Sequence, residues 1–182
     1  MLKINLPTKH GTFQMLEFNG GYALMKGDVS RKEEVLTRVH SSCFTSEVFG
    51  SLRCDCQEQL QDALMRIEQE GIGILIYLQQ EGRGIGLSNK LKAYQLQEQG
   101  YDTVEANEKL GFAADLRDYT AAARLLQSLG VKSVRLLTNN PRKVKGLQEK
   151  GIKVERGSSI MDKNQHNAFY LETKKEKLGH LL

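Results

Sequence analysis

The chain has 182 residues, and its 26 lysines and arginines exceed its 22 aspartates and glutamates, giving a formal net charge of +4 at pH 7. This length, with 40 % hydrophobic and 26 % charged residues, is typical of one globular domain and excludes collagen-like or disordered chains. So small a positive excess does not indicate nucleic-acid binding, for which the positive charge should also be clustered.

The sequence offers no segment suited to crossing a membrane. Its longest apolar stretch, Gly71–Leu78, is far shorter than the roughly 20 residues that a spanning helix needs. Residues Met1–Pro7 hold no extended apolar core before a small-residue cleavage site, so we expect no secretion signal. We therefore predict a cytoplasmic protein that binds neither membranes nor nucleic acids.

The N-terminal part, residues 1–42, is predicted to be rich in short strands. Apolar and polar residues mix along Thr12–Phe18, Asn19–Gly21 is a turn signal, and the apolar run resumes at Tyr22–Met25. A further strand is expected at Val35–Val39. This part of the chain carries no helical period.

A helix is predicted to start near Gln57, because the apolar period changes there to that of one helix face. Gly71 should end this helix, and Ile74–Leu78 is expected to be a short buried strand. A glycine-rich connection, Gln80–Gly86, then leads into a second helix that carries Leu91. The apolar residues at helical spacing in the first helix are Leu60, Ala63, Leu64 and Ile67.

The second half of the chain is predicted to alternate between helices and strands. The segment Tyr101–Asp118 is less regular, whereas Asn139–Pro141 suits a helix start, because Asn can cap a helix and Pro fits its first turn. With the β-rich N-terminal part, this alternation predicts an α/β fold around a mixed sheet, and we expect a single domain over residues 1–182. The other predicted elements are a helix at Tyr119–Leu129, strands at Val134–Thr138 and Ile152–Glu155, and a last helix at Phe169–Leu178.

The three cysteines, Cys43, Cys54 and Cys56, all lie within fourteen residues. Thiolates favour zinc, and three of them can occupy three corners of a tetrahedron. A catalytic zinc site keeps its fourth position for water, whereas a structural site is closed by a fourth protein ligand, which His40 could supply. Ordinary buried thiols are the third possibility, since residues at i and i+2 share one face of a strand. The spacing alone leaves these alternatives open.

A glycine-rich segment, Glu81–Gly86, is expected between a strand and a helix. It is neither a Walker A loop nor a convincing dinucleotide fingerprint, but its glycines let backbone N–H groups approach an anion. Arg83 could add a bidentate phosphate contact, and Glu81 could accept hydrogen bonds from N1–H and the exocyclic amine of guanine. A flexible turn with solvated charges is the alternative interpretation.

Two further clusters combine charge with a possible phosphate contact. Thr138–Lys143 places a hydroxyl and two cations at a strand-to-helix turn, although an ordinary capped helix start would look the same. Asp115 and Arg117 could form an exposed ion pair of little energetic value, or act as a proton acceptor and a phosphate-directed group. The spacing does not decide between these roles.

The motifs Arg38–Cys43 and Gly50–Cys56 resemble those of GTP cyclohydrolase II. The resemblance extends from about Arg38 to the C-terminus and is specific, because several long motifs follow in the family's order. The further matching segments are Gln80–Gly86, Gly100–Asn107, Leu110–Asp118, Leu137–Lys143 and Gly179–Leu182.

The resemblance implies a zinc- and magnesium-dependent hydrolase, usually a homodimer. Such an enzyme converts GTP to 2,5-diamino-6-ribosylamino-4(3H)-pyrimidinone 5′-phosphate, formate and pyrophosphate, the committed step of riboflavin biosynthesis. It implies that Cys43, Cys54 and Cys56 hold one zinc ion, whose water attacks C8 of guanine, while Mg²⁺ accompanies the GTP phosphates. This supports the open zinc site and leaves His40 as a pocket residue.

The resemblance also implies roles for three further side chains. Arg117 matches a proposed nucleophile on the α-phosphate and Asp115 a proton acceptor, whereas Tyr94 matches a tyrosine associated with completing formyl removal. Because a guanidinium is almost never deprotonated in proteins, Arg117 could instead stabilise phosphoryl charge. The implied GTP contacts are Arg38, Val39, His40, Ser41, Ser42, Gln59, Glu81, Gly82, Arg83, Thr103, Thr138 and Lys143.

The chain departs from the family pattern at Ser42, where a Glu is common, and at Gln57, where a Gly is common. Loss of a carboxylate beside the metal could change affinity or rate, but we do not expect it to change the reaction. The dihydroxybutanone phosphate synthase domain fused to many relatives is expected to be absent, because 182 residues leave no room for it.

Two other classes of protein are weighed against the cyclohydrolase. The first is a zinc-stabilised nucleotide-binding or regulatory protein without turnover; Ser42 favours it, whereas Tyr94, Asp115 and Arg117 argue against it. The second is a small zinc-ribbon-like nucleic-acid binder, which would need four metal ligands and a basic face.

Overall fold

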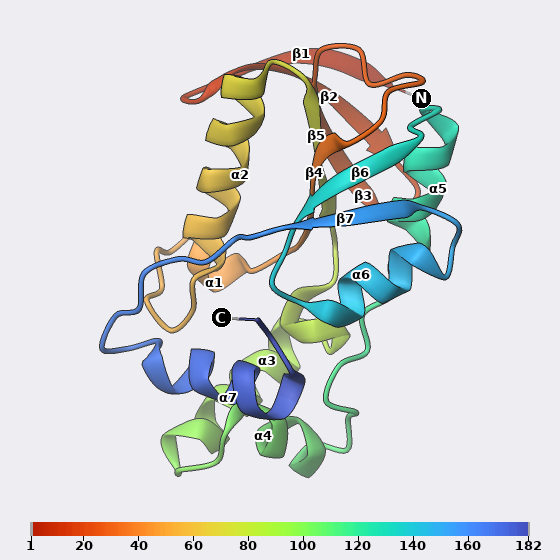
Figure 1. The fold of residues 1–182 in the computed structure, drawn as a ribbon. Helices are drawn as coiled ribbons and strands as arrows, with labels where there is room; N and C mark the ends of the chain where they lie inside the picture. Colours follow the sequence, from red (N-terminus) through yellow and green to blue (C-terminus); the bar gives the residue numbers. More distant parts are fainter. Residues whose placement is uncertain (1, 182) are drawn as a thin grey trace.

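The computed structural model describes residues 2–181, and these form one seven-stranded mixed sheet with helices around it (Figure 1). The strand order is β1-β2-β3-β5-β4-β6-β7. Neighbours from β1 to β5 run antiparallel, whereas β5, β4, β6 and β7 are parallel to one another. The strands are β1 (Lys3–Thr8), β2 (Gly11–Phe18), β3 (Gly21–Lys26), β4 (Val35–Ser41), β5 (Gly73–Leu78), β6 (Ser133–Leu137) and β7 (Lys153–Gly157).

The helices lie in two places relative to this sheet. The helix α2 lies against one face and α5 and α6 lie on the other, while α3, α4 and α7 gather beyond the carboxyl ends of β4 and β5 (Figure 1). The α-helices are α1 (Phe44–Glu47), α2 (Cys56–Glu70), α3 (Leu87–Glu98), α4 (Thr103–Lys109), α5 (Thr120–Ser128), α6 (Pro141–Gln148) and α7 (Ala168–Leu178), and η1 (Glu81–Gly84) is a 3₁₀ turn.

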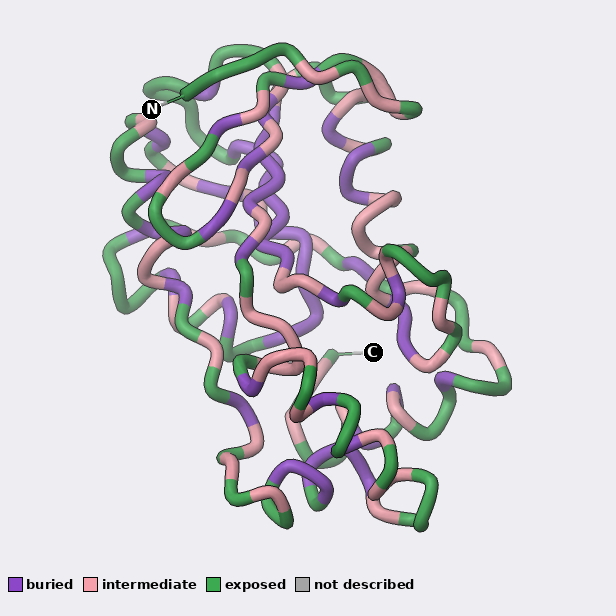
Figure 2. The backbone as a smooth tube through the Cα atoms, turned by 180° about the vertical axis from the view of Figure 1, so that it is seen from behind, coloured by how far each residue is buried: buried purple, intermediate pink, exposed green. Residues whose placement is uncertain are grey.

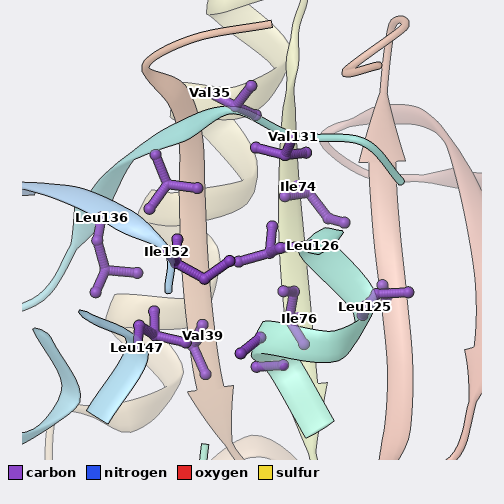
Figure 3. Packing of buried hydrophobic residues seen from close by; sticks show 14 of the residues in the cluster. Val35, Val39, Ile74, Ile76, Leu125, Leu126, Val131, Leu136, Leu147 and Ile152 are labelled. Atoms are coloured by element: carbon purple, nitrogen blue, oxygen red, sulfur yellow. The ribbon is translucent and has the colours of Figure 1, made fainter. Parts of the chain in front are cut away.

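The two central parallel strands, β4 and β5, are buried on both faces. Since successive side chains of a strand point to opposite sides, each of these strands contributes to both cores. On β4, Val35 and Val39 enter the core beneath α5 and α6, whereas Leu36 enters the smaller core beneath α2. On β5, Ile76 enters the first core (Figure 3) and Leu75 enters the second. The buried stretches of backbone gather in the middle of the sheet (Figure 2).

Most of the elements predicted from the sequence are confirmed, within a residue or two at their ends. The α/β class and the mixed sheet are confirmed as well. Gly71 ends α2 as expected, since its φ of 74° lies in the left-handed region that glycine adopts without strain. Asn140 caps α6, with its side chain accepting from the backbone N–H of Arg142, and Pro141 fills the first helical position.

The segment 101–118, expected to be irregular, contains the helix α4. The helix starts at a capping box: the Asp102 side chain accepts from the N–H groups of Val104 and Glu105, and the Glu105 side chain accepts from the N–H of Asp102. The Asp-x-x-Glu spacing was present in the sequence, but without an apolar period it predicts no helix. Across residues 2–181 we find no helix with the length and apolar character to span a membrane.

Candidate functional site

The predicted site residues converge at the carboxyl ends of the parallel strands. Cys43 follows β4, Glu81 follows β5 and Thr138 follows β6. In open α/β sheets, this edge is where ligands bind, because the loops after neighbouring strands leave a crevice there. The side chains of β4 itself reach the same edge, where Arg38 and His40 are buried.

The three cysteines form a compact group of sulfur ligands. Their sulfur atoms all lie within 4.8 Å of one another, and the Sγ atoms of Cys43 and Cys54 are 3.6 Å apart. Cys43 directly precedes α1 and Cys56 opens α2, so two helix starts bring the thiols together. Within residues 2–181 this is the one cluster of His, Cys, Asp or Glu side chains whose arrangement could hold a metal ion.

The protonation of these thiols is strongly linked. Hydrogen bonds from Cys54 and Cys56, with the charge of Lys90, lower the pKa of Cys43. The hydrogen bond with Cys43 raises the pKa of Cys54. Hydrogen bonds with Cys43 and Cys54 likewise raise the pKa of Cys56. One thiolate therefore forms readily, whereas three require a cation among them. Zn²⁺ fits this donor set, because thiolates are its preferred ligands.

His40 does not join the thiol group. Its Nε2 atom donates to Oε1 of Glu47 over 2.8 Å, and burial lowers the pKa of its ring. The same Glu47 carboxylate accepts from the backbone N–H of Cys43 at 2.9 Å and from the hydroxyl of Tyr77 at 2.6 Å. The closed site that His40 could have completed is therefore not formed, and His40 helps to position Cys43 through Glu47.

Three cations next to the thiols have no carboxylate partner. Arg38 donates to the carbonyl of Leu137 at 2.8 Å, Lys143 donates to the carbonyl of Val39 at 2.5 Å, and Arg83 donates to neutral oxygen atoms of α4 and the loop after it. Across residues 2–181 none of the three forms an ion pair. Burial, and then the charges of Arg38 and Arg117, lower the pKa of Lys143. An anion bound here would relieve that repulsion.

Unpartnered polar atoms point to a ligand in the same place. In the described part of the chain, Nε of Arg38, Nδ1 of His40, Oγ of Ser41 and Nδ2 of Asn140 are buried without a hydrogen-bond partner. All four residues line one hollow of about 640 Å³. Buried polar groups in native proteins are nearly always hydrogen-bonded, so their clustering indicates a polar ligand.

This cationic hollow continues into a second one, of about 660 Å³, at the thiols. Together they form one cleft with a thiol end and a cationic end. The residues that line both hollows are Ser41, Cys56, Arg83, Arg117 and Tyr170.

Arg117 lies at this junction and is held by Asp115. Its Nε and Nη2 atoms donate to the two oxygens of the carboxylate at 2.9 and 2.8 Å. Burial would raise the pKa of Asp115, but the hydrogen bond and charge of Arg117 hold it below its usual value. Burial would likewise lower the pKa of Arg117, but Asp115 raises it. Arg117 is therefore a firmly protonated guanidinium, and the pair is buried rather than an exposed ion pair.

Tyr94 lies on α3 and lines the thiol end of the cleft. Its hydroxyl is 3.4 Å from that of Thr45, and the guanidinium of Arg53 lies 4.7 Å from its ring centroid. Burial raises the pKa of Tyr94, so its hydroxyl keeps its proton at neutral pH.

Glu81 is already engaged by protein donors. Its Oε2 atom accepts from the backbone N–H of Phe44 at 2.6 Å, and its Oε1 atom accepts from Lys90 at 2.7 Å. A guanine ring bound to Glu81 would therefore have to share these oxygens with Phe44 and Lys90. The backbone of Gly82 and Arg83, with φ of 61° and 62°, turns through the left-handed region and brings the Arg83 side chain toward α4.

The structure brings together nearly all the residues predicted for the site. The two exceptions are Val39, whose side chain is in the core and whose carbonyl holds Lys143, and Asp115, which lies behind Arg117. The predicted residues at the thiol end include Ser42, Glu81, Gly82, Tyr94 and Thr103, and those at the cationic end include Arg38, His40, Gln59, Thr138 and Lys143.

Several site residues escaped sequence reasoning. Lys90 is four residues before Tyr94, one helical turn away on the same face, so the position of Tyr94 could have revealed it. Glu47 and Tyr77 carry no local signal, because their partners come from other elements. The same is true of Lys174, which lines the cationic hollow from the far end of the chain.

An α/β domain that joins a three-thiol group able to hold a metal ion to cations without a carboxylate partner in residues 2–181 is suited to metal-assisted chemistry on a phosphorylated substrate. Comparison with known families agrees: the sequence model of GTP cyclohydrolase II matches residues 1–158, and the chain belongs to that family. The prediction that the chain belongs to this enzyme family is thereby confirmed.

Among curated proteins, the chain is 57 % identical over 188 residues to the riboflavin biosynthesis protein RibBA of Bacillus cereus (strain B4264). It is 57 % identical over the same length to the RibBA of Bacillus mycoides (strain KBAB4). Each alignment covers 100 % of the chain and 47 % of the relative, so the chain spans about half the length of these proteins.

Proposed function

We propose that this chain is a zinc-dependent GTP cyclohydrolase II that converts GTP to 2,5-diamino-6-ribosylamino-4(3H)-pyrimidinone 5′-phosphate, formate and pyrophosphate. The observation that carries the proposal is the cleft itself, with a three-thiol group at one end and unpaired buried cations at the other. Family membership and relatives named as riboflavin biosynthesis proteins support the first committed step of that pathway.

Cys43, Cys54 and Cys56 would hold one zinc ion per chain, since their sulfur atoms are already gathered. Bound zinc supplies a Lewis acid and, with an open fourth position, water with a pKa near 7, the chemistry needed to attack C8 of guanine. The protein prepares its ligands for this: Glu47 fixes the backbone of Cys43, and Lys90 donates to its sulfur at 3.1 Å.

The phosphates of GTP, with Mg²⁺, would occupy the cationic hollow. Arg38, Arg83 and Lys143 present charges there that no carboxylate of the described chain offsets. Guanidinium groups bind phosphate bidentately, and the buried setting strengthens each contact. This orientation places the nucleoside end of the substrate at the thiols.

Arg117 would bind the α-phosphate at the junction of the two hollows and stabilise its developing negative charge. The resemblance implies a nucleophile here, but the raised pKa of Arg117 opposes loss of its proton. Asp115 would orient the guanidinium by its two hydrogen bonds and serve as the adjacent proton acceptor. Tyr94, which keeps its proton, would donate to the departing formyl group at the thiol end.

The broader predictions form part of the same proposal: one domain over residues 1–182, a homodimer, and a cytoplasmic protein that does not bind nucleic acid. Ser42 lines the thiol end of the cleft without supplying a carboxylate. We propose that it changes affinity or rate rather than the reaction.

Mass spectrometry of the products formed from GTP tests this function. Protein of measured zinc content, incubated with GTP and Mg²⁺, should release formate and pyrophosphate in equal amounts, and Cys54→Ser should abolish turnover. Stoichiometric GTP binding without product would instead indicate a nucleotide-binding protein without turnover. GTP that is neither bound nor consumed would refute both functions.

A further inference from the structure

The C-terminal helix α7 forms one wall of the cationic hollow. Residues 159–182 lie outside the part of the chain that the family model matches, yet Tyr170, Lys174 and His180 line the hollow beside Arg38 and Lys143. The helix packs against α4, beyond the carboxyl ends of the central strands (Figure 1). The wall is thus contributed by the C-terminal end of the chain, far in sequence from Arg38.

Polar contacts hold this wall to two other parts of the chain. The Nζ atom of Lys177 pairs with Glu105 at 2.9 Å and also with Asp102, both at the start of α4. Beyond the helix, the backbone N–H of Leu181 donates to the carbonyl of Asn139 at 2.9 Å, in the turn after β6. The position of α7 is therefore tied to two segments that themselves border the cleft.

Lys174 is the residue of α7 that carries positive charge into the hollow. Its side chain is 12 % exposed, and its Nζ atom is 3.2 Å from Oδ1 of the buried Asp55. In the sequence, Asp55 stands between Cys54 and Cys56. Asp55 in turn accepts from Gln59 at 2.5 Å, and Gln59 accepts from Arg38. Lys174 and Arg38 are therefore the two ends of one hydrogen-bonded chain that runs through Asp55 and Gln59.

An ammonium group has three N–H donors. Asp55 takes one of those of Lys174, and the ring of Tyr170 lies 4.2 Å from Nζ. The lining of the cationic hollow contains Lys174 but no Asp or Glu side chain among the described residues. A donor of Lys174 is thus available to an anion in the hollow, and no carboxylate borders that space.

We infer that Lys174 is a substrate-binding residue, and that α7 brings it to the terminal phosphates of a nucleoside triphosphate in the cationic hollow. This inference rests on the proposed function for the identity of the substrate. The competing account is that Lys174 only balances the buried charge of Asp55.

Binding measurements on the zinc-loaded chain separate the two accounts. By isothermal titration calorimetry, Lys174→Gln should weaken binding of GTP and of inorganic tripolyphosphate about tenfold, as expected for loss of one charge-assisted contact. Binding of GMP should change less than twofold, since it lacks the terminal phosphates. Lys174→Arg should retain most of the affinity, and Lys175→Gln, an exposed neighbour on α7, should behave as wild type.

The Asp55→Asn background removes the charge that Lys174 would otherwise balance. If Lys174 binds phosphate, Lys174→Gln should still weaken GTP binding about tenfold in that background. Equal affinities of Asp55→Asn and the double variant for GTP would overturn the inference, and so would equal losses for GTP and GMP. Zinc content and thermal unfolding of each variant show whether it is folded and loaded.

The tripolyphosphate titrations do not depend on opening of the guanine ring, because tripolyphosphate has none. A chain that binds tripolyphosphate through Lys174 but does not consume GTP would contradict the proposed function and support the inference. A chain that consumes GTP, and whose KM is the same after Lys174→Gln, would support the proposed function and contradict the inference.

Discussion

The Nζ atom of Lys90 lies 3.1 Å from the sulfur of Cys43, and the same ammonium is 2.7 Å from the carboxylate of Glu81. A proposed metal ligand and the residue predicted to recognise guanine are thus joined through one buried lysine. Because the ammonium stabilises the thiolate form of Cys43, it acts on the metal site without belonging to the thiol group.

Replacing Lys90 by methionine should weaken zinc binding. The substitution removes the hydrogen bond and charge at Cys43 while keeping an unbranched side chain, and loss of such outer contacts typically costs 10–100-fold in metal affinity. Competition with a chromophoric chelator at pH 7 measures the change. Lys92→Met, on the exposed side of the same helix, is the matched control, and equal zinc affinity in both variants would show that Lys90 does not support the site.

Replacing Glu47 by alanine should destabilise the fold. The change leaves the ring of His40, the hydroxyl of Tyr77 and the N–H of Cys43 without their shared acceptor. Each abandoned buried donor costs about 1–3 kcal/mol, so the loss of the acceptor for all three should lower the free energy of unfolding by about 3 kcal/mol or more. Tyr77→Phe removes only one of these contacts and should cost about 1 kcal/mol. Urea unfolding of the zinc-loaded proteins gives both values, and equal costs would contradict the shared-acceptor role.

Replacing Arg117 by lysine should lower kcat by about a hundredfold and leave zinc content unchanged. The variant keeps a positive charge but loses the bidentate geometry toward Asp115 and the phosphate. Steady-state rates of pyrophosphate release measure the effect. A wild-type rate that climbs steadily above pH 9 would instead indicate a deprotonated, nucleophilic guanidinium, against the raised pKa of Arg117.

His180 should make the stability of the chain depend on pH in the acid range. Burial, with the charges of Lys174 and Arg117, lowers its pKa to about 3, whereas the unfolded chain should titrate near 6.5. Between these values the unfolded state binds the proton and the folded state does not, so stability should fall as pH drops from about 6.5 toward 3.

His180→Asn should therefore lose less stability than the wild type between pH 7 and pH 5. Urea unfolding at the two pH values gives the difference, and the comparison with wild type cancels the contribution of His40, which is also buried and has a lowered pKa. Identical losses in the two proteins would mean that His180 is solvent-exposed in solution.

The local parts of the fold and site could be predicted because their signals lie close together in the sequence. The apolar run of β5, the glycine after α2 and the Asn-Pro start of α6 each depend on neighbouring residues. The helix α4 was missed, since a capping box without an apolar face leaves most of its stability to tertiary packing. The direction in which His40 turns was also undetermined, because its spacing from Cys43 allowed it to be a fourth metal ligand, whereas its contact with Glu47 is visible only in the folded chain.

The sequence by itself determined which chemistry the chain carries: three thiols within fourteen residues, and cations placed in turns after successive strands. Those signals are local, and residue type alone sets the preference of thiolates for zinc and of guanidinium groups for phosphate. Only the tertiary structure decided which charges are neutralised. It pairs Arg117 with Asp115, leaves Arg38 and Lys143 without an ion pair among residues 2–181, and brings Lys174 across 119 positions to Asp55. Such pairings depend on how whole elements pack, and no spacing along the chain encodes them.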